Sequence, residues 1–337
     1  MVNQFAVLIV AFGLSLGITP IARRVALRMK IIDHPGERKI HLLPMPLLGG
    51  LGIYAAVLIV CLLFNDGLAH FQIIAILTGA TLLTLTGVLD DSHRLHPQVK
   101  LLFGMPLAAL ILLIGGVQVS FLPHPALNAA WTLLWVVGIT AAISILDHMD
   151  GLVAGVAAIA AVFYLILAVL GEQYLVSILA AAVLGAALGF LRYNFKPASI
   201  FMGDTGALFL GFMLAVLGLK TRVPWQLDGI SWMAPVLIVA VPIFDTALVT
   251  ISRLRRGLIP FTTPGEDHVT HRLVILGLTQ RQAVTVMYLV GTVGGLSALF
   301  VAYTSWLLAY ALAVTLGLGA LVGIGVLEKV DVPEEYD

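Results

Sequence analysis

The chain has 337 residues, of which 60% are hydrophobic and only 11% are charged, and its formal net charge is zero. Soluble domains carry about 25% charged residues, so this composition excludes a protein whose whole surface faces water. Lipid must cover part of the molecule, and a net charge of zero favours no class of charged partner.

Eleven apolar segments approach the length of about 20 residues that a helix needs to cross a bilayer. The first begins near the N-terminus without a basic leader or a small-residue cleavage site, which predicts a retained span rather than a signal peptide. The fifth and eighth are short, and we expect them to be tilted or shielded by neighbours. The chain is therefore predicted to be an all-α, polytopic integral membrane protein with 10 or 11 transmembrane helices. The predicted spans are residues 3–21, 47–64, 71–89, 99–116, 130–146, 152–170, 174–191, 203–219, 232–251, 282–303 and 306–326.

The distribution of lysine and arginine between the loops predicts the orientation. With the N-terminus outside, 16 of the 18 basic residues fall inside, and only Lys220 and Arg222 fall outside. We therefore expect the N-terminus outside and the C-terminus in the cytoplasm. Residues 1–326 are predicted to form a single transmembrane domain, and residues 327–337 a cytoplasmic tail. The predicted cytoplasmic loops are at about 22–46, 90–98, 147–151, 192–203 and 252–281.

The first inside loop is basic and carries Arg38, Lys39 and His41. It is interpreted either as a patch that anchors the chain at the membrane surface or as a phosphate-binding site. The third span then ends in two adjacent carboxylates, Asp90 and Asp91, where negative charge opposes the helix dipole. A divalent cation or a nearby lysine would relieve their repulsion, and one of them could act as a base. A solvated helix end is the alternative.

Asp147 and Asp150 end the fifth span, and a spacing of three residues would place both on one face of a helix. Gly151 follows and would let a substrate approach the backbone; a capping role is the alternative. Asp204 lies between two glycines just before the eighth span. It would either cap that helix or hold Mg²⁺ while the free amides of the helix hold phosphate.

The last large inside loop carries two histidines three residues apart, His268 and His271, followed by Arg272. A zinc site is one interpretation, but neither a cysteine nor an H-E-x-x-H pattern accompanies them. Phosphate binding beside Arg272 is favoured, and a solvated loop is the remaining alternative. Asp245 lies within the ninth span, where an acid must be paired, and Arg253 or Lys100 is its predicted partner.

Five carboxylates thus gather at one predicted interface, which suggests a cation site. Taken in order, the motifs resemble the polyprenyl-phosphate N-acetylhexosamine-1-phosphate transferases of glycosyltransferase family 4 (WecA/TagO/MraY-like). The chain looks more like the undecaprenyl-phosphate GlcNAc-1-phosphate transferase branch than the phospho-MurNAc-pentapeptide translocase branch. The matching motifs are D-x-P-x-x-R-K-x-H (Asp33 to His41), P-x-P-x-x-G-G (Pro44 to Gly50), G-x-x-D-D (Gly87 to Asp91), D-x-x-D-G-L-V-A-G (Asp147 to Gly155), N-F-x-P-A-x-x-F-M-G-D-T-G (Asn194 to Gly206), V-P-x-x-D-T (Val241 to Thr246) and H-x-x-H-R-L (His268 to Leu273).

The resemblance implies an enzyme that transfers N-acetylhexosamine-1-phosphate, expected to be GlcNAc-1-phosphate, from a UDP-sugar to undecaprenyl phosphate. It implies release of UMP, dependence on Mg²⁺ (with Mn²⁺ as an alternative), and the start of a lipid-linked cell-surface glycan. The expected location is the inner (cytoplasmic) membrane, with a multi-pass chain and an active site that faces the cytoplasm. The implied partners are the UDP-sugar, the polyprenyl phosphate and the bilayer. No nucleic acid is expected, and a homodimer is one alternative assembly.

The same resemblance implies roles for residues at the matching positions. The expected catalytic residues are Asp90, Asp91 and Asp204. Of these, Asp204 and Asp91 are expected to bind the metal, and Asp90 to bind or deprotonate the lipid phosphate. The expected substrate-binding residues are Asp147, Asp150, His268, His271, Arg272, Lys100, Arg38, Lys39, His41 and Asn194.

Four positions depart from the family pattern. Ser144 replaces an asparagine, His148 a glycine, Thr270 a histidine, and Ala207 a serine. The first three fall where the sugar nucleotide should lie, so the sugar stays open. Two alternatives follow from them: a member that uses a different UDP-sugar, and a scaffold that has lost catalysis. A transporter is less favoured, because transporters usually carry their acids at the membrane midplane in repeated halves, and no repeat is apparent here.

Overall fold

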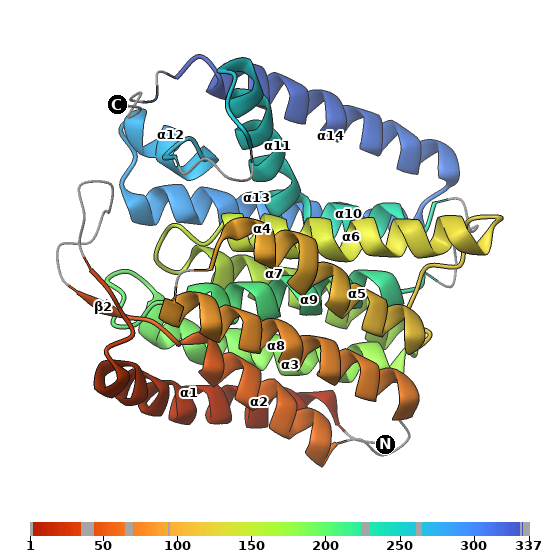
Figure 1. Ribbon diagram of the computed structural model, residues 1–337. Coiled ribbons are helices and arrows are strands. Elements are labelled where there is room, and N and C mark those ends of the chain that lie inside the picture. Colours follow the sequence, from red (N-terminus) through yellow and green to blue (C-terminus); the bar gives the residue numbers. More distant parts are fainter. Residues whose placement is uncertain are drawn as a thin grey trace.

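The computed structural model describes residues 3–34, 44–64, 70–93, 95–223, 230–260, 265–330 and 332. Within these residues the chain is almost entirely helical, which confirms the predicted all-α class. Two short strands, β1 (Ile32–Asp33) and β2 (Met45–Pro46), pair antiparallel. The long helices run roughly side by side, so their ends and the connecting loops gather at two opposite ends of the bundle (Figure 1).

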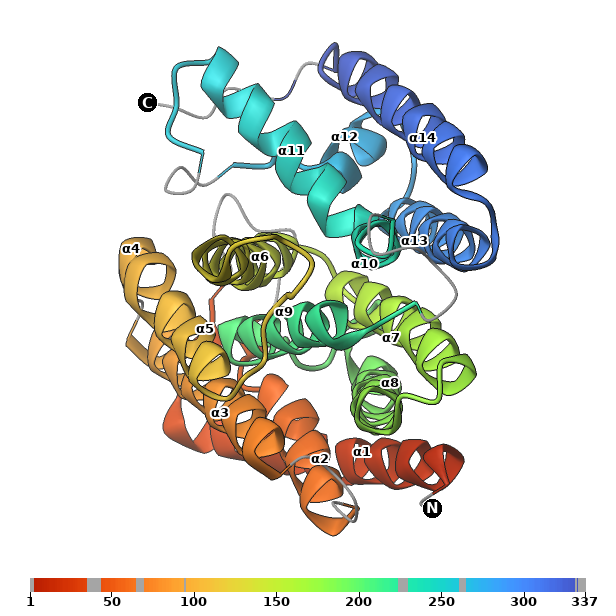
Figure 2. The same ribbon diagram turned by 90° about the vertical axis from the view of Figure 1, so that its right-hand side faces the viewer.

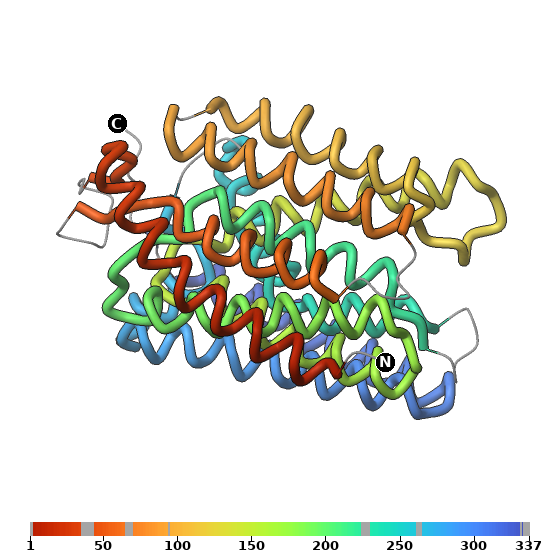
Figure 3. The backbone as a smooth tube through the Cα atoms, turned by 90° about the horizontal axis from the view of Figure 1, so that it is seen from below, coloured from red at the N-terminus to blue at the C-terminus, as the bar shows by residue number. Residues whose placement is uncertain are grey.

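The helices follow one another along the chain with short connections. They are α1 (Gln4–Met29), α2 (Gly50–Leu63), α3 (His70–His93), α4 (Pro97–Val99), η1 (Lys100–Gly104), α5 (Met105–Ile114), α6 (Pro125–Ile145), α7 (Leu152–Leu170), α8 (Tyr174–Asn194), α9 (Gly203–Lys220), α10 (Met233–Ile238), α11 (Ala240–Arg255), α12 (Val269–Ile275), α13 (Gln280–Tyr303) and α14 (Trp306–Leu327). Helices α4, η1 and α5 form one continuous rod with a π-helical turn that begins at Lys100. Seen from below, α1 crosses the bundle diagonally (Figure 3).

Nine helices in the described part of the chain are long and apolar enough to cross a membrane. Each of the eleven predicted spans falls on a helix, but two are shorter than expected: α2 has 14 residues, and span 232–251 is divided into α10 and α11. The division has a local cause, because Pro242 lacks an N–H and its ring clashes with the carbonyl of Ile238, the residue at which α10 ends. The number of helices that cross the membrane and their orientation stay predictions.

The fifth predicted span is not short, so that expectation was wrong. Helix α6 has 21 residues and starts at Pro125, upstream of the apolar run. Proline fits the first helical turn because its fixed φ angle is already helical and its missing N–H would have no partner there. The eighth, α9, has 18 residues and lies in the centre of the bundle, with α3, α5, α6, α7 and α8 around it (Figure 2).

Small residues let the central helices approach closely. A side chain at Gly185 or Gly189 of α8 would strike the backbone of α1 at Leu8 or Phe12, and such glycines are typical of helix contacts in membranes. The outer helices instead expose large apolar side chains, and α14 buries only Ala309. Water would not tolerate so much exposed apolar surface, so lipid must cover it. The protein is a multi-pass membrane protein.

Candidate functional site

The first turn of α9 lies between the start of α2 and the end of α3. The amides of Gly49 and Gly50 donate to the carbonyls of Phe201 and Met202, both at 3.0 Å. On the other side, a Cβ at Gly87 of α3 would strike the backbone of Asp204 and Thr205. The absence of side chains at these glycines therefore brings α2, α3 and α9 together at one end of the bundle.

Asp91 caps this turn from the neighbouring helix. Its Oδ1 accepts the Asp204 amide at 2.9 Å, and its Oδ2 accepts the Thr205 amide at 3.1 Å and the Thr205 hydroxyl at 2.6 Å. A helix leaves its first amides without partners inside the helix, and a carboxylate is a strong acceptor for them. Asp91 therefore occupies the amides of Asp204 and Thr205, which one of the two interpretations of the sequence left for phosphate. Its predicted part in metal binding stays a prediction.

Asp90 and Asp204 share one lysine. The Lys100 ammonium is 3.0 Å from Asp90 Oδ2 and also contacts Asp204 Oδ2, and Ser144 donates to Asp204 Oδ1 at 2.8 Å. The three charged side chains are only 15–16% exposed, so water screens them weakly and their charges must balance locally. Of the two cations expected beside Asp90 and Asp91, a lysine is present, and it pairs with Asp90 and Asp204 rather than with Asp91.

Asp147 and Asp150 lie in the turn that joins α6 to α7. They do not share a helical face, because α6 ends at Ile145 and α7 begins at Leu152, so that expectation was wrong. Gly151 has a φ angle of +78°, which glycine adopts at no steric cost. Its amide donates to Asn194 Oδ1 at 3.0 Å and its carbonyl accepts the Tyr288 hydroxyl at 2.6 Å.

The same turn is tied to the segment before α9. Asp150 Oδ2 accepts the Ala198 amide at 3.1 Å and lies 3.8 Å from the Lys196 ammonium. Asn194 Nδ2 donates to the Ile200 carbonyl at 3.1 Å. The oxygen and the nitrogen of this side chain, which was predicted to bind substrate, therefore both bind the protein itself. The structure thus fixes the turn that carries Asp147 relative to the helix that carries Asp204.

Asp147 has a different environment from the other acids. Burial, followed by the charges of Asp204, Asp91 and Asp150, raises the pKa of Asp147 to about 8. No hydrogen bond from a described residue offsets this effect. Opposite charge or hydrogen bonding is the usual means of holding such a group ionised, so Asp147 is a buried carboxyl whose negative charge no described residue offsets.

The histidines form a separate cluster beside this turn. His268 Nδ1 lies 2.7 Å from Asp245 Oδ2, and the Val269 amide donates to Asp245 Oδ1 at 2.9 Å. The predicted partners of Asp245 were therefore wrong: the acid caps α12 and holds His268. The ring nitrogens of buried His271 make no hydrogen bond of good geometry with a described residue, although the Glu266 backbone acts on the ring. Burial, followed by the neighbouring His268, lowers the pKa of His271 to about 4, so this ring is neutral at pH 7.

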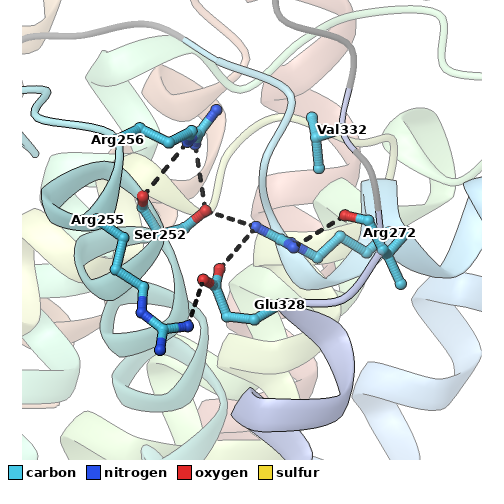
Figure 4. A pocket seen from close by; sticks show the side chains of 7 residues that line it. Ser252, Arg255, Arg256, Arg272, Glu328 and Val332 are labelled. Carbon is cyan, nitrogen blue, oxygen red and sulfur yellow. Dashed lines mark hydrogen bonds and ion pairs between the residues drawn. The ribbon is translucent and has the colours of Figure 1, made fainter.

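Arg272 uses its donors within the protein. Its guanidinium donates to the carbonyls of Asp267, Leu327 and Val330, to the Ser252 hydroxyl and to the Glu328 carboxylate. An arginine has five N–H groups, and five acceptors take them. Figure 4 shows the contacts of Arg272 with Ser252 and Glu328 at a pocket of about 170 Å³, where Glu328 also meets Arg255. The predicted phosphate contact of Arg272 finds no spare donor in this arrangement.

Comparison with known proteins gives the family. The model of glycosyl transferase family 4 matches residues 73–222, which include Asp90, Lys100, Asp147 and Asp204. A probable undecaprenyl-phosphate N-acetylglucosaminyl 1-phosphate transferase of Bacillus subtilis (strain 168) is 37% identical over 314 residues, which cover 89% of this chain and 87% of that protein. The chain belongs to glycosyl transferase family 4.

More distant relatives in this family cover similar shares of the chain. A decaprenyl-phosphate N-acetylglucosaminephosphotransferase of Mycobacterium tuberculosis (strain ATCC 25618 / H37Rv) is 31% identical over 317 residues, 82% of this chain and 78% of that protein. An undecaprenyl-phosphate alpha-N-acetylglucosaminyl 1-phosphate transferase of Yersinia pestis is 26% identical over 289 residues, 82% of this chain and 78% of that protein. The resemblance drawn from the motifs is confirmed.

Of the site residues expected for a member of glycosyl transferase family 4, three cannot be placed. Arg38, Lys39 and His41 lie outside the described residues. Conversely, sequence reasoning missed Tyr288, which holds the α6–α7 turn from α13, and Thr205, which binds Asp91. Thr205 follows Asp204 within a quoted motif and could have been found from it. Tyr288 lies in an apolar span far along the chain and carries no local signal.

Proposed function

We propose that this protein transfers GlcNAc-1-phosphate from UDP-GlcNAc to a polyprenyl phosphate and releases UMP. The observation that carries the proposal is the cluster at the start of α9, where Asp90 and Asp204 share Lys100 and the carboxyl of Asp147 has no hydrogen-bond partner among the described residues. The substrate class follows the printed names of the relatives, which act on undecaprenyl or decaprenyl phosphate.

The chemistry explains why such a cluster is needed. An oxygen of the lipid phosphate attacks the phosphorus that carries the sugar, and the bond from that phosphorus to the bridging oxygen breaks, so UMP departs with the electron pair. Both reactants are anions, and phosphoryl transfer depends mainly on positioning and on charge stabilisation. The Lys100 ammonium lies between Asp90 and Asp204. It can release these carboxylates and bind phosphate oxygens of the substrates instead. Asp90, at the end of α3, is suited to orient the attacking lipid phosphate.

The donor set at this site fits Mg²⁺. That ion prefers carboxylate oxygens in small number and completes its shell with water and phosphate oxygens. Asp204 and Asp147 offer such oxygens, and the repulsion around Asp147 is of the kind that a divalent cation relieves. Among the described residues no group of three or more His, Cys, Asp or Glu side chains is already arranged for a metal, so substrate oxygens would have to complete the coordination. When bound, the ion would neutralise charge that develops on the diphosphate.

The site is proposed to face the cytoplasm of a bacterial inner membrane. The helix ends that carry Asp90, Asp147 and Asp204 share one end of the bundle, and the bias of basic residues assigns that end to the inside. UDP-sugars are cytoplasmic, so this orientation gives the soluble donor access to the site. The lipid acceptor would reach it along the bilayer.

The test is UMP release by the purified, detergent-solubilised protein supplied with undecaprenyl phosphate and UDP-GlcNAc. We expect release that requires Mg²⁺ or Mn²⁺, and a loss of at least about 100-fold in Asp204→Asn, the scale typical of removing one group that stabilises charge in the transition state. Glu172→Gln, in the turn between α7 and α8 at the far end of both helices, is the matched control and should keep full activity.

A panel of UDP-sugars in the same assay decides the substrate. UDP-GlcNAc should give the highest kcat/KM, and a preference for another UDP-N-acetylhexosamine would correct the sugar while keeping the reaction. Absence of UMP release with every sugar and both metals would overturn the proposed function. Full activity in Asp204→Asn would overturn the part proposed for the start of α9.

A further inference from the structure

A small pocket is formed where the ends of α11 and α14 meet α12 (Figure 4). Its volume is about 170 Å³, whereas pockets for drug-sized ligands measure about 300–1,000 Å³. The pocket therefore has room for one small group and not for a nucleotide sugar. Its lining shares no residue with the cluster of Asp90, Lys100, Asp147 and Asp204, so it is a second cavity with its own chemistry.

Positive charge prevails among the described residues that line this pocket. Arg255, Arg256 and Arg272 are accompanied by one acid, Glu328, which leaves an excess of two positive charges. The side chains of Arg272 and Glu328 are only 2% and 11% exposed. Water screens charges weakly in such a place, and they are costly unless ions of opposite sign balance them. The pocket is therefore suited to an anion.

A second acid behind the pocket does not remove this excess. Asp267 accepts from Arg253 through both of its oxygens, at 3.0 and 2.8 Å, and from Arg256 at 2.6 Å. Arg253 does not line the pocket, so the count gains one acid and one arginine together. The excess of two positive charges is unchanged.

Two of the three arginines keep donors for a ligand. Arg272 has none to spare and forms a fixed wall. Arg256 uses Nε and Nη2 within the protein, which leaves its Nη1 without a hydrogen bond to a described residue. Arg255 makes a single contact, from Nη1 to Glu328 at 3.3 Å, and its side chain is 70% exposed. Guanidinium groups match the oxygens of a phosphate in geometry and charge.

Exposed apolar side chains flank the pocket and indicate where the anion comes from. Leu254, next to Arg255, is 61% exposed, and Val326, in the last turn of α14, is 58% exposed. In a membrane protein such side chains face acyl chains, so the pocket lies where two helices leave the hydrocarbon. Basic pockets between transmembrane helices are typical sites for the headgroups of anionic lipids.

We propose that the pocket between α11, α12 and α14 binds a phosphate group of net negative charge, and that the headgroup of an anionic phospholipid supplies it. The phosphate would bind the free donors of Arg255 and Arg256, and the acyl chains would lie along α14 past Val326. This inference goes beyond the proposed function and does not depend on it. Inorganic phosphate offers the same chemistry without the acyl chains, and the experiment separates the two sources.

The test is thermal unfolding of the purified full chain in detergent, without substrates. Dioleoyl phosphatidylglycerol should raise the melting temperature of the wild type by at least about 2 °C, because a ligand that binds only the folded state stabilises it. Dioleoyl phosphatidylcholine has the same acyl chains but no net charge, and should raise it much less. Inorganic phosphate at millimolar concentration should also act weakly. An equal rise with inorganic phosphate that Arg255→Gln abolishes would support the site and name soluble phosphate as the source.

Arg255→Gln is the primary variant, because this exposed side chain has a single contact in the described structure and its loss leaves the fold intact. It should weaken binding of phosphatidylglycerol by about 10-fold, the scale of one hydrogen bond to a charged group, and Arg255→Lys should recover part of the loss. Arg192→Gln is the matched control. Arg192 is an exposed arginine in the last turn of α8, so this change removes the same charge outside the pocket and should leave the shift unchanged.

Three results would overturn the inference. They are an equal rise with phosphatidylcholine and phosphatidylglycerol, a full shift in Arg255→Gln, and a shift that Arg192→Gln loses as well. A rise of about 10-fold in KM for undecaprenyl phosphate in Arg255→Gln would also overturn it, because the pocket would then hold the acceptor lipid. Melting temperatures need no turnover, so a wild type without UMP release would overturn the proposed function and leave this test decisive.

Discussion

Two adjacent acids show how far residue type alone can lead. Asp91 gives its carboxylate to the backbone of α9, whereas Asp90 faces Lys100. The pair was predictable as a site of charge repulsion, and Lys100 as a residue of the same site. The different roles of the two acids were not predictable, because they depend on which acid faces the glycine-lined start of α9. The partner of Asp245 was misjudged for the same reason: it prefers His268, whose position only the folded chain reveals.

At this scale we predict that Asp91→Asn and Asp204→Asn differ in stability. An asparagine at 91 would turn an N–H group toward amides that need an acceptor, and losing such a cap costs about 1–2 kcal/mol. Asp91→Asn should therefore lower the melting temperature, whereas Asp204→Asn keeps an oxygen for the Lys100 and Ser144 donors and should lower it less while activity is lost. Thermal unfolding in detergent makes the comparison, and equal melting temperatures would contradict the capping role of Asp91.

Helices, as elements, were the most predictable level of this fold. Length and hydropathy place all eleven spans on helices, because a chain in lipid must satisfy its backbone within each segment. Length and hydropathy could not predict the close contacts at glycines, because an apolar segment has the same hydropathy whichever of its faces packs against a neighbouring helix. The break before Pro242 was only partly predictable. Proline disturbs a helix locally, but the neighbouring elements determine whether the helix ends there.

For the contact between α3 and α9 we predict a large effect of a single methyl group. In Gly87→Ala the new Cβ would strike the backbone of Asp204 and Thr205, and overpacking of this kind typically costs 1–3 kcal/mol. Activity should fall with it, because α9 carries Asp204. Gly17→Ala on α1 is the matched control, since a Cβ there meets nothing within 4 Å and alanine favours a helix. Similar melting temperatures for the two variants would contradict the packing described here.

The candidate site lies at one end of the molecule and is built from residues of both halves of the sequence. The sequence predicted that the acids and histidines share an interface, because topology and the spacing of spans are enough for that. It did not predict that Arg272 would bind the end of α14, since an arginine beside histidines looks like a phosphate ligand whether or not a carboxylate is within reach. Glu328 supplies that carboxylate from 56 residues away.

For the folded protein as a whole we predict that two buried groups act in opposite directions between pH 7 and pH 5: His271 lowers stability on acidification, whereas Asp147, whose pKa is raised to about 8, increases it. The folded pKa of His271, about 4, lies below the unfolded value near 6.5. The unfolded chain therefore binds a proton first, and stability on the order of 3 kcal/mol is lost as pH falls from 6.5 toward 4.

Asp267 acts in the same direction as His271 at lower pH. Burial raises its pKa, but hydrogen bonds and charge from Arg253 and Arg256 outweigh this and lower it below the usual value, so its contribution is lost only below about pH 4. Melting temperatures measured between pH 7 and pH 5 should show the wild type losing stability relative to His271→Gln, because only the wild type carries the buried imidazole. Parallel curves would contradict the neutral state of buried His271.

Helix α14 buries a single residue, Ala309, along its length, and Arg272 and Glu328 secure its final turn. Its 22 residues span about 33 Å, slightly more than the roughly 30 Å core of an average bilayer. A helix with so little lateral packing adjusts its tilt to bilayer thickness more freely than its neighbours do. Arg272 holds the final turn of α14 next to the histidine cluster. A change in the tilt of α14 would therefore exert a force on the residues of that cluster. The lipid composition of the host membrane would then tune the geometry of the histidine cluster, without any ligand binding to it.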